Sequence, residues 1–279
     1  MAAVAPSSHS SPWNIFTSLR WDPQLQNNSQ SPSSSSYYML PYHQERMLSA
    51  ADDFGWEGAK QALKGSIGMA NLTRALDSYV ASSASAKTLH LERSLKLRVL
   101  LAQDGCLTIT SVETPDVGIR NLLPTTLPAR MSDDSNFSVA WLVFISPIRT
   151  VPSLHTRHKT THRSMYDEVR ECIPPAARSP VSGGTAEILL VNEEDAIMEG
   201  SITTPYFLRD GRWITPPENA GGNRGTTRRW ALENGLCIEK TIAKSDLKTG
   251  EKLWLSNGVR GWGVGIIVDL RPDIEIPLP

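Results

Sequence analysis

Five short segments in the first half of the chain have the residue pattern of β-strands. Apolar and polar side chains roughly alternate in residues 15–21, and this period of two places successive side chains on opposite faces. The other segments are short apolar or alternating runs, and Asp104-Gly105 is a hairpin signal between two of them. The predicted strands cover residues 15–21, 37–40, 95–101, 106–110 and 141–145.

Two helices are predicted among these strands. Apolar residues recur at helical spacing after His43, so we expect a helix that begins near Tyr42 or His43 and ends at Gly55. A second helix is expected over residues 71–83. Hairpin strands with helices to one side indicate an α+β arrangement.

The second half of the chain also mixes helices and strands. A short helix is expected over about residues 161–171, and a second one runs from Thr226, a good N-terminal residue, to Gly235, a good stop. The segment Arg209-Asp210-Gly211-Arg212 is a hairpin signal. The predicted strands cover residues 186–191, 197–199, 206–208, 213–215, 253–256 and 264–268.

The pattern divides the chain into two expected domains. Residues 1–12 are small and polar and are interpreted as a disordered leader, and residues 26–36 form a serine-rich, low-complexity loop. We expect an N-terminal α/β domain over residues 13–146, a linker over 147–157 and a larger, β-rich C-terminal domain over 158–279.

Composition narrows the class of protein. The 279 residues are 40% hydrophobic, which can support a core, and the formal net charge of −1 with no basic stripe disfavours nucleic acid or an anionic membrane as partner. No apolar run reaches the roughly 18–20 residues of a membrane span, and the first residues lack the features of a secretory signal. Three widely separated cysteines favour reduced thiols in a cytoplasmic protein, and no metal-binding motif is present.

Four short blocks carry the candidate chemistry. Lys159 is an amine that can form a Schiff base, and Glu199, 40 residues later, is an acid that can pair with a pyridine nitrogen. Gly225-Thr226-Thr227-Arg228 opens a predicted helix, whose free N–H groups can bind an anion, and Ser256-Asn257-Gly258 can supply a second phosphate turn. Each block alone is more often a solvated charge or an ordinary cap, but together they supply a site for pyridoxal 5'-phosphate (PLP).

The same blocks carry a resemblance to a known family. Glu-Gly-Ser-Ile-Thr-Thr-Pro-Tyr-Phe from Glu199, Gly-Thr-Thr-Arg from Gly225 and Leu-Ser-Asn-Gly-Val-Arg-Gly from Leu255 follow the order found in class IV PLP-dependent aminotransferases. That family includes branched-chain and D-amino acid aminotransferases and aminodeoxychorismate lyases. The resemblance runs from about Phe16 to Val268 and implies a two-domain D-amino acid aminotransferase-like fold, with PLP between the domains, in a homodimer.

The resemblance also implies a role for individual residues. Lys159 is similar to the Schiff-base lysine and proton shuttle, and Glu199 to the partner of the pyridine nitrogen. Arg157 or Arg260 can bind a carboxylate of the small-molecule amino substrate through paired N–H donors. The expected contacts to the cofactor phosphate are made by Arg46 of a His-x-x-Arg helix, Thr226, Thr227, Asn257 and Gly258.

Three activities remain open at this stage. Asn257 after a serine resembles the lyase subgroup, in which Lys159 removes a proton and aminodeoxychorismate yields pyruvate and 4-aminobenzoate. An amino acid transaminase of the branched-chain or D-amino acid type, including one that serves a specialised-metabolite pathway, would use the same lysine and glutamate. A catalytically inert binding protein is the third reading. Thr204 in place of the family's usual asparagine, and the apparent insertion over 172–184, resemble a fungal lyase-like branch.

Overall fold

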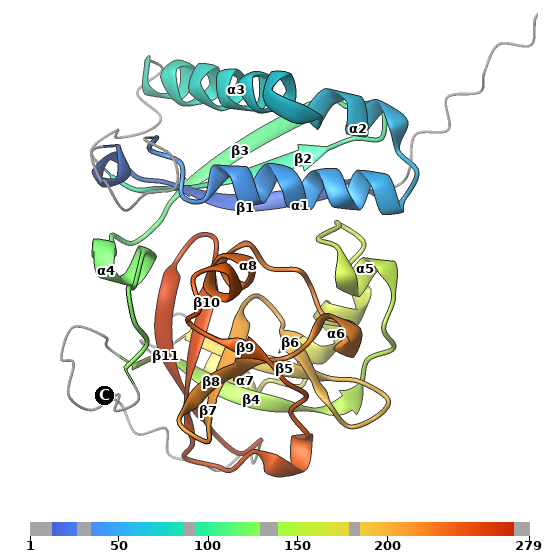
Figure 1. Ribbon diagram of the computed structural model, residues 1–279, viewed down its shortest axis with the longest axis vertical. Helices are drawn as coiled ribbons and strands as arrows, with labels where there is room; N and C mark the ends of the chain where they lie inside the picture. The colour runs from blue at the N-terminus through green and yellow to red at the C-terminus, as the bar shows by residue number, and fades with distance from the viewer. Residues whose placement is uncertain (1–12, 27–34, 86–92, 129–138, 179–184, 271–279) are drawn as a thin grey trace, which may run out of the picture.

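A computed structural model describes residues 13–26, 35–85, 93–128, 139–178 and 185–270 of the chain (Figure 1). In Figure 1, a small sheet with three helices lies above a larger sheet that carries most of the remaining elements. The expected leader, residues 1–12, lies outside the described part, as does most of the serine-rich segment. The mixture of helices and largely antiparallel strands agrees with the expected α+β class.

The smaller unit is a three-stranded antiparallel sheet with helices on one face. Its strand order is β1-β2-β3, and β2 in the middle pairs along its full length with both neighbours. Its apolar core includes Leu19 of the first strand, Met47 of the first helix and Leu76 of the third. Its elements are β1 (Ile15–Trp21), α1 (Leu40–Asp53), α2 (Glu57–Leu63), α3 (Gly65–Ser85), β2 (Leu95–Leu101) and β3 (Leu107–Glu113).

Strand β2 shows why this sheet has one apolar and one polar face. Leu95, Leu97, Val99 and Leu101 are fully buried in the core beneath the helices, whereas the alternate residues are half-buried on the opposite face. Because side chains alternate along a strand, the same register places Phe16 and Ser18 of β1 on that opposite face with them. This uncovered face is the one that the smaller unit turns toward the larger unit.

The larger unit is an eight-stranded mixed sheet in the order β6-β5-β4-β11-β10-β7-β8-β9. Strand β4 pairs in parallel with both β5 and β11, so segments far apart in the sequence meet at the centre of the sheet. Its strands are β4 (Val139–Arg149), β5 (Thr185–Val191), β6 (Ile197–Gly200), β7 (Thr204–Arg209), β8 (Arg212–Thr215), β9 (Ile238–Glu239), β10 (Lys252–Asn257) and β11 (Gly261–Ile267). The helices are α4 (Ile119–Leu122), α5 (Leu154–Arg157), α6 (Ser164–Glu171), α7 (Pro175–Arg178) and α8 (Thr226–Glu233).

Most of the predicted elements are confirmed, and one is wrong. Residues 37–40 do not form a strand: Tyr37 makes only an isolated bridge to Trp21, and Leu40 already begins α1. The apolar character of this segment reflects burial at the start of a helix, where Tyr38 donates a 2.5 Å hydrogen bond to the carbonyl of Leu122. The short helix α2 was not predicted. It follows Gly55, which has a φ of 69° and lies just after the end of α1.

The chain crosses from the small sheet to the large one earlier than predicted. The strand predicted at 141–145 is confirmed, but it extends from Val139 to Arg149 and belongs to the eight-stranded sheet. The predicted boundary between residues 146 and 147 therefore falls inside a strand. A strand's neighbours in a sheet are set by long-range pairing, which periodicity along one segment does not reveal.

A fully buried ion pair lies where the two units contact each other. Arg20 at the end of β1 lies 2.7 Å from Asp22, and neither side chain is exposed. The Arg20 guanidinium also donates to Ser94 at 2.5 Å and to the carbonyl of Pro115 at 2.9 Å. Its backbone N–H donates to the carbonyl of Gly258 in the β10–β11 turn, which is part of the larger unit.

Removing this buried cation is expected to cost substantial stability. In the variant Arg20→Met, Asp22 would stay buried without its partner, and breaking such a pair typically costs about 3–5 kcal/mol. Arg93→Met breaks an exposed pair with Glu113 and is expected to cost under about 1 kcal/mol. Urea unfolding of the two variants measures the difference, and equal midpoints would show that the buried pair contributes no more than the exposed one.

Candidate active site

A cavity of about 500 Å³ opens between the two units. Its upper wall is the uncovered face of the small sheet, with Phe16, Ser18, Lys96 and Arg98. Its other walls come from the end of β6, the start of α8 and the β10–β11 turn. Lys159, Glu199 and the predicted phosphate turns all line this one cavity, although they are far apart in the sequence.

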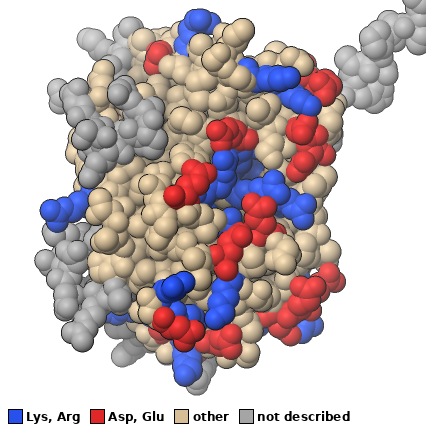
Figure 2. Space-filling view, viewed as in Figure 1, with Lys and Arg blue, Asp and Glu red and all other residues tan. Residues whose placement is uncertain are grey.

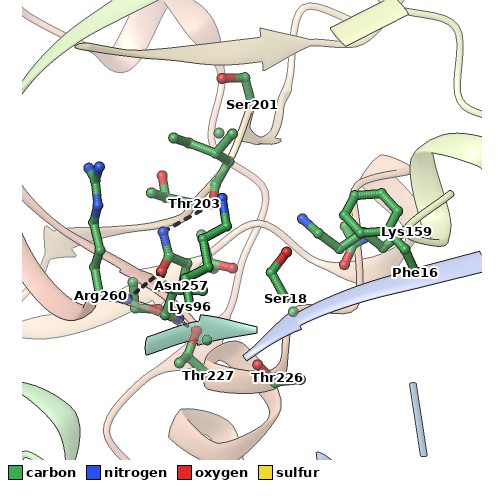
Figure 3. Close-up of a pocket in the computed structure, with 18 of the residues that line it drawn as sticks. Phe16, Ser18, Lys96, Lys159, Ser201, Thr203, Thr226, Thr227, Asn257 and Arg260 are labelled. Carbon is green, nitrogen blue, oxygen red and sulfur yellow. Dashed lines mark hydrogen bonds between the residues drawn. The ribbon is translucent and has the colours of Figure 1, made fainter. Parts of the chain in front are cut away.

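The backbone around Lys159 is fixed to the first strand. The Phe16 N–H donates to the Lys159 carbonyl at 2.9 Å, and Thr160 bridges to Ile15 in the adjacent position. On the other side, the ring of the preceding residue, His158, lies with Nε2 2.6 Å from a carboxylate oxygen of Asp53 at the end of α1. The lysine is thus held at the junction of the two units, with its side chain directed into the cavity (Figure 3).

The surroundings of Lys159 favour a neutral amine. Desolvation, followed by the positive charges of Arg46 and Arg163, lowers the pKa of Lys159 to about 7, and the negative charge of Glu199 opposes this shift. The Lys159 Nζ lies 5.1 Å from the centroid of the Phe16 ring, which forms one side of its environment. Because only the unprotonated amine attacks an aldehyde or takes up a proton, this lysine is suited to act as nucleophile and base near neutral pH.

Glu199 lies at the end of β6 and is almost completely buried. Its Oε1 atom is 2.5 Å from the hydroxyl of Tyr166, which also lies 3.0 Å from the carbonyl of Thr156 and can donate its single proton to only one of them. Burial raises the pKa of Glu199 to about 7, and the hydrogen bonds from Tyr166 and the backbone of Asn223 oppose that rise. A cation placed against this carboxylate would keep it ionised, as a protonated pyridine nitrogen does.

A second buried carboxylate, Glu187 on β5, shapes the loop that follows Glu199. Glu187 accepts hydrogen bonds from the hydroxyls of Ser201 at 2.5 Å and Thr203 at 2.6 Å, and from the backbone N–H of Ile202 at 3.2 Å. A Cβ on Gly200 would lie 2.6 Å from the Thr203 hydroxyl, so glycine is needed for this close approach. The loop is therefore held in one conformation along the cavity wall, which Ser201 and Thr203 line while their hydroxyls are bonded to Glu187 (Figure 3).

The part of the cavity next to the N-terminus of α8 and the β10–β11 turn has the features of a phosphate site. Helix α8 points its N-terminus into it, and Gly225 and Gly258 leave space where a side chain would collide with Thr204 and His43, respectively. Within the described residues, the Nε atom of Arg46 and the hydroxyl of Thr226 are buried without a hydrogen-bond partner. Free donors beside a helix N-terminus fit the phosphate of PLP.

Arg46 is aligned by the small sheet. Its guanidinium donates to the hydroxyl of Thr17 on β1, and the same hydroxyl lies 2.6 Å from Nδ1 of His43, one turn earlier on α1. Burial is the main reason that the pKa of Arg46 is lowered, to about 10, and the negative charge of Glu199 opposes the effect. The predicted His-x-x-Arg pair thus forms a small network with Thr17.

Asn257 organises the turn that carries the predicted second phosphate contact. Its Oδ1 accepts hydrogen bonds from the backbone N–H groups of Val259 at 3.0 Å and Arg260 at 2.8 Å, and its Nδ2 donates to the Ile202 carbonyl at 3.3 Å (Figure 3). The preceding Ser256 donates to the hydroxyl of Thr227 at 2.7 Å. These bonds join the β10–β11 turn to the start of α8 and to the loop after Glu199.

The two predicted substrate arginines have different positions. Arg260 lines the cavity, with its guanidinium carbon 5.0 Å from the centroid of the Trp141 ring. Arg157, in α5, is not among the residues that line the cavity. Sequence reasoning also missed several residues that do line the cavity, among them Lys96, Arg98 and Tyr166.

Many of the described basic side chains outside the cavity are paired with acidic ones. On the face shown in Figure 2, acidic and basic side chains are interspersed rather than gathered into one large patch of a single sign. Arg229, for example, lies 2.5 Å from Glu45, and Arg224 lies 3.0 Å from Glu218. None of the helices in the described part of the chain combines the length and apolar character needed to cross a bilayer.

Comparison with known proteins agrees with this geometry. The family model described as amino-transferase class IV matches residues 15–264. A curated protein of Schizosaccharomyces pombe, provisionally named aminodeoxychorismate lyase, is 32% identical over 120 residues. That match covers 42% of this chain and 49% of the relative, so the chain aligns with about half of the relative's length.

Solved structures share the fold over nearly the whole chain. A protein from Mesorhizobium loti, provisionally named an amino-acid aminotransferase, has a TM-score of 0.61 and 22% identity, over 92% of this chain and all of that one. The PLP-bound form of a hypothetical aminotransferase from Mycobacterium tuberculosis has a TM-score of 0.56 and 15% identity, over 95% of this chain and 83% of that one. At these identities the likeness shows the fold, and it agrees with the two-unit arrangement around a shared cavity.

Proposed function

The chain belongs to the class IV aminotransferase family of PLP-dependent enzymes, and we propose that it is an aminodeoxychorismate lyase, which forms 4-aminobenzoate and pyruvate. One observation supports the PLP-dependent chemistry most strongly. The amine of Lys159 and the buried carboxylate of Glu199 line the same cavity, which also has the features of a phosphate-binding site. The lyase assignment is favoured by the partial match to the S. pombe relative and by Asn257 after Ser256.

PLP, when bound, acts as an electron sink for a carbanion formed beside the substrate nitrogen. Lys159 would hold the cofactor and then remove the proton from the substrate carbon that bears the amine. Glu199 would keep the ring nitrogen protonated, while Tyr166 fixes the carboxylate in place. Arg46, Thr226 and Thr227 would hold the phosphate, and Asn257 and Gly258 would complete that end of the site.

The lyase reaction needs no second substrate. The bond between a ring carbon and the ether oxygen of the enolpyruvyl group breaks, and the ring loses the proton that Lys159 removes and becomes aromatic. The enolpyruvyl group leaves as an enolate, which takes up one proton at carbon and becomes pyruvate, so the amine stays on the ring. A transaminase would instead return the proton to the cofactor and pass the amino group to a keto acid. The fate of the shared carbanion depends on the placement of the proton donor, and both outcomes use the same lysine.

The proposed function is tested by the products formed without an amino acceptor. Purified PLP-loaded protein is incubated with aminodeoxychorismate, and pyruvate and 4-aminobenzoate are measured by chromatography. A lyase forms the two in equal amounts. Amino-group transfer from an amino acid to a keto acid, without pyruvate release from aminodeoxychorismate, would assign a transaminase. If neither pyruvate release nor amino-group transfer is detected with any amino donor, the protein is an inert binding protein.

We further propose that the enzyme acts in the cytoplasm, as the three separated cysteines suggest, and as a homodimer, as the family resemblance implies. The three described cysteines form no disulfide among themselves, as expected of reduced thiols. Light scattering after size-exclusion chromatography measures the mass of the particle against the 30.7 kDa of one chain. A mass near that of one chain would contradict the dimer.

A further inference from the structure

The cavity contains many more positive than negative side chains. Only two carboxylates among the described residues line it, Glu113 at its mouth and Glu199 in its interior, and Glu113 is already 3.2 Å from Arg93. Six cationic side chains line the same cavity: Arg46, Lys96, Arg98, Lys159, Arg163 and Arg260. Like charges gathered in a partly desolvated space repel one another, so this arrangement favours an anionic occupant.

Two of these six cations already have a role in the proposed function. Arg46 lies at the phosphate end, and Lys159 is the reacting amine. The remaining four belong to three different parts of the fold, namely β2, the segment before α6 and the β10–β11 turn. Arg163 lies 3.8 Å from Asp167, but a single carboxylate is satisfied by one arginine through two parallel N–H donors, so these cations still exceed what a substrate with one carboxylate requires.

Lys96 and Arg98 are the most distinctive members of this group. Both lie on β2, two residues apart, and therefore point from the same face of the small sheet into the cavity. In the described part of the chain, no acidic side chain lies within ion-pair distance of either one. The Arg98 guanidinium stacks instead on the Phe16 ring at 4.3 Å, the same ring that contacts the Lys159 amine at 5.1 Å.

Repulsion among these cations affects the pKa of Lys96. Burial lowers its pKa first, and the charges of Arg98, Arg260 and Arg163 lower it further. The same side chain contributes to the lowered pKa of Lys159. The four cations are thus close enough to interact with one another and with the reacting amine, and a bound anion would relieve that repulsion.

We propose that Lys96 and Arg98, together with Arg163, form a second carboxylate-binding site on the substrate side of the cavity. The preferred substrate is then a primary amine that carries two carboxylates. Arg260, in the β10–β11 turn, would bind the other carboxylate (Figure 3). This inference rests on the proposed function for the identity of that amine, but the carboxylate site itself can be tested without turnover.

The test compares two aromatic probes in the PLP-loaded protein. Benzene-1,3-dicarboxylate and benzoate have the same ring and differ in one carboxylate, and calorimetry measures the affinity of each. The wild type is expected to bind the dicarboxylate about 10- to 100-fold more tightly, the range for one added charge-assisted interaction. Equal affinities for the two probes would overturn the inference.

Variants then assign the preference to the strand. Lys96→Gln and Arg98→Gln are each expected to reduce the preference for the dicarboxylate by about 10-fold or more, and Lys96→Arg, which keeps the charge, is expected to retain it. Arg74→Gln is the matched control. Arg74 lies on α3, away from the sheet face that lines the cavity, and forms an exposed hydrogen bond with Asn71. Circular dichroism checks that each variant is folded.

The outcomes separate this inference from the proposed function. If the wild type forms no pyruvate from aminodeoxychorismate but keeps the dicarboxylate preference, the lyase proposal fails and the carboxylate site stands. If pyruvate forms but Lys96→Gln and Arg98→Gln bind both probes as the wild type does, the site is refuted and the lyase stands. Loss of the preference in Lys96→Arg as well would show that the charge at this position is not what binds the second carboxylate.

Discussion

Replacing Lys159 by alanine is expected to reduce turnover by about 10⁴-fold or more. The amine would serve both as the attachment point of the cofactor and as the base, and acid–base catalysis by one side chain alone contributes up to about 10⁴-fold. The truncation leaves the backbone contacts of Lys159 with Phe16 intact, so the fold should be preserved. Steady-state product formation and circular dichroism measure the two effects separately.

A chemical control identifies the lysine directly. Borohydride reduction of the PLP-loaded wild type, followed by peptide mass mapping, should place the cofactor on the peptide that contains Lys159. Lys60→Ala is the matched variant, because Lys60 lies on the outer surface of α2 and pairs with Asp52. It should keep full activity and the same labelled peptide. Cofactor trapped on another lysine, or full turnover by Lys159→Ala, would remove Lys159 from the proposed role.

The second large effect is expected at Glu199. Glu199→Gln keeps the shape of the side chain but removes the charge that would hold a proton on the ring nitrogen of the cofactor. We expect turnover to fall by about 10²–10³-fold, the range found when one preorganised electrostatic partner is removed. The measurement is the single-turnover rate at saturating substrate and PLP, so that weaker binding of either does not enter.

Two comparisons guard the interpretation of that result. Glu199→Asp retains the charge with a shorter side chain and should have a rate between those of the wild type and Glu199→Gln. Tyr166→Phe removes the 2.5 Å hydrogen bond to Glu199 but leaves the carboxylate, and should cost less than Glu199→Gln. A Glu199→Gln enzyme with an unchanged rate would show that the buried carboxylate has no part in the chemistry.

The parts of the site that the sequence predicted are those whose chemistry is local. Lys159, Glu199 and the Gly225-Thr226-Thr227 turn are short blocks in which residue type and order carry the information, and the structure brings all of them to one cavity. Their roles in catalysis stay predictions until the variants above are measured. The two-unit fold itself agrees with the expectation from the resemblance.

The residues that sequence reasoning missed depend on contacts between distant segments. The alternation in β2 reveals that Lys96 and Arg98 share a face, but an alternating strand normally turns its charged face to water. Only the docking of the larger unit makes that face the wall of a cavity. Tyr166 was hidden for the same reason, since its partner Glu199 lies 33 residues away along the chain.

Arg157 is the converse case, a predicted substrate residue that does not line the cavity. Arg157 is the last residue of α5 and His158 after it is extended, so the helix ends between Arg157 and Lys159, and of these two residues only Lys159 lines the cavity. Proximity along the chain is thus a weak guide to shared function where a helix ends. The hydrogen bond from the Arg224 N–H to the Arg157 carbonyl marks the neighbour that this segment actually contacts.

The strand order of the large sheet has a consequence for how the protein is made. Strand β11, the last described strand, lies at the centre of the sheet, between β4 and β10. During synthesis, more than a hundred residues are added after β4 before its second neighbour, β11, is available. One edge of β4 stays unpaired and exposed during that time. Pairing over such sequence separation is slow and leaves intermediates prone to association. We expect this unit to fold only after β11 has left the ribosome, with the cavity completed in the same event.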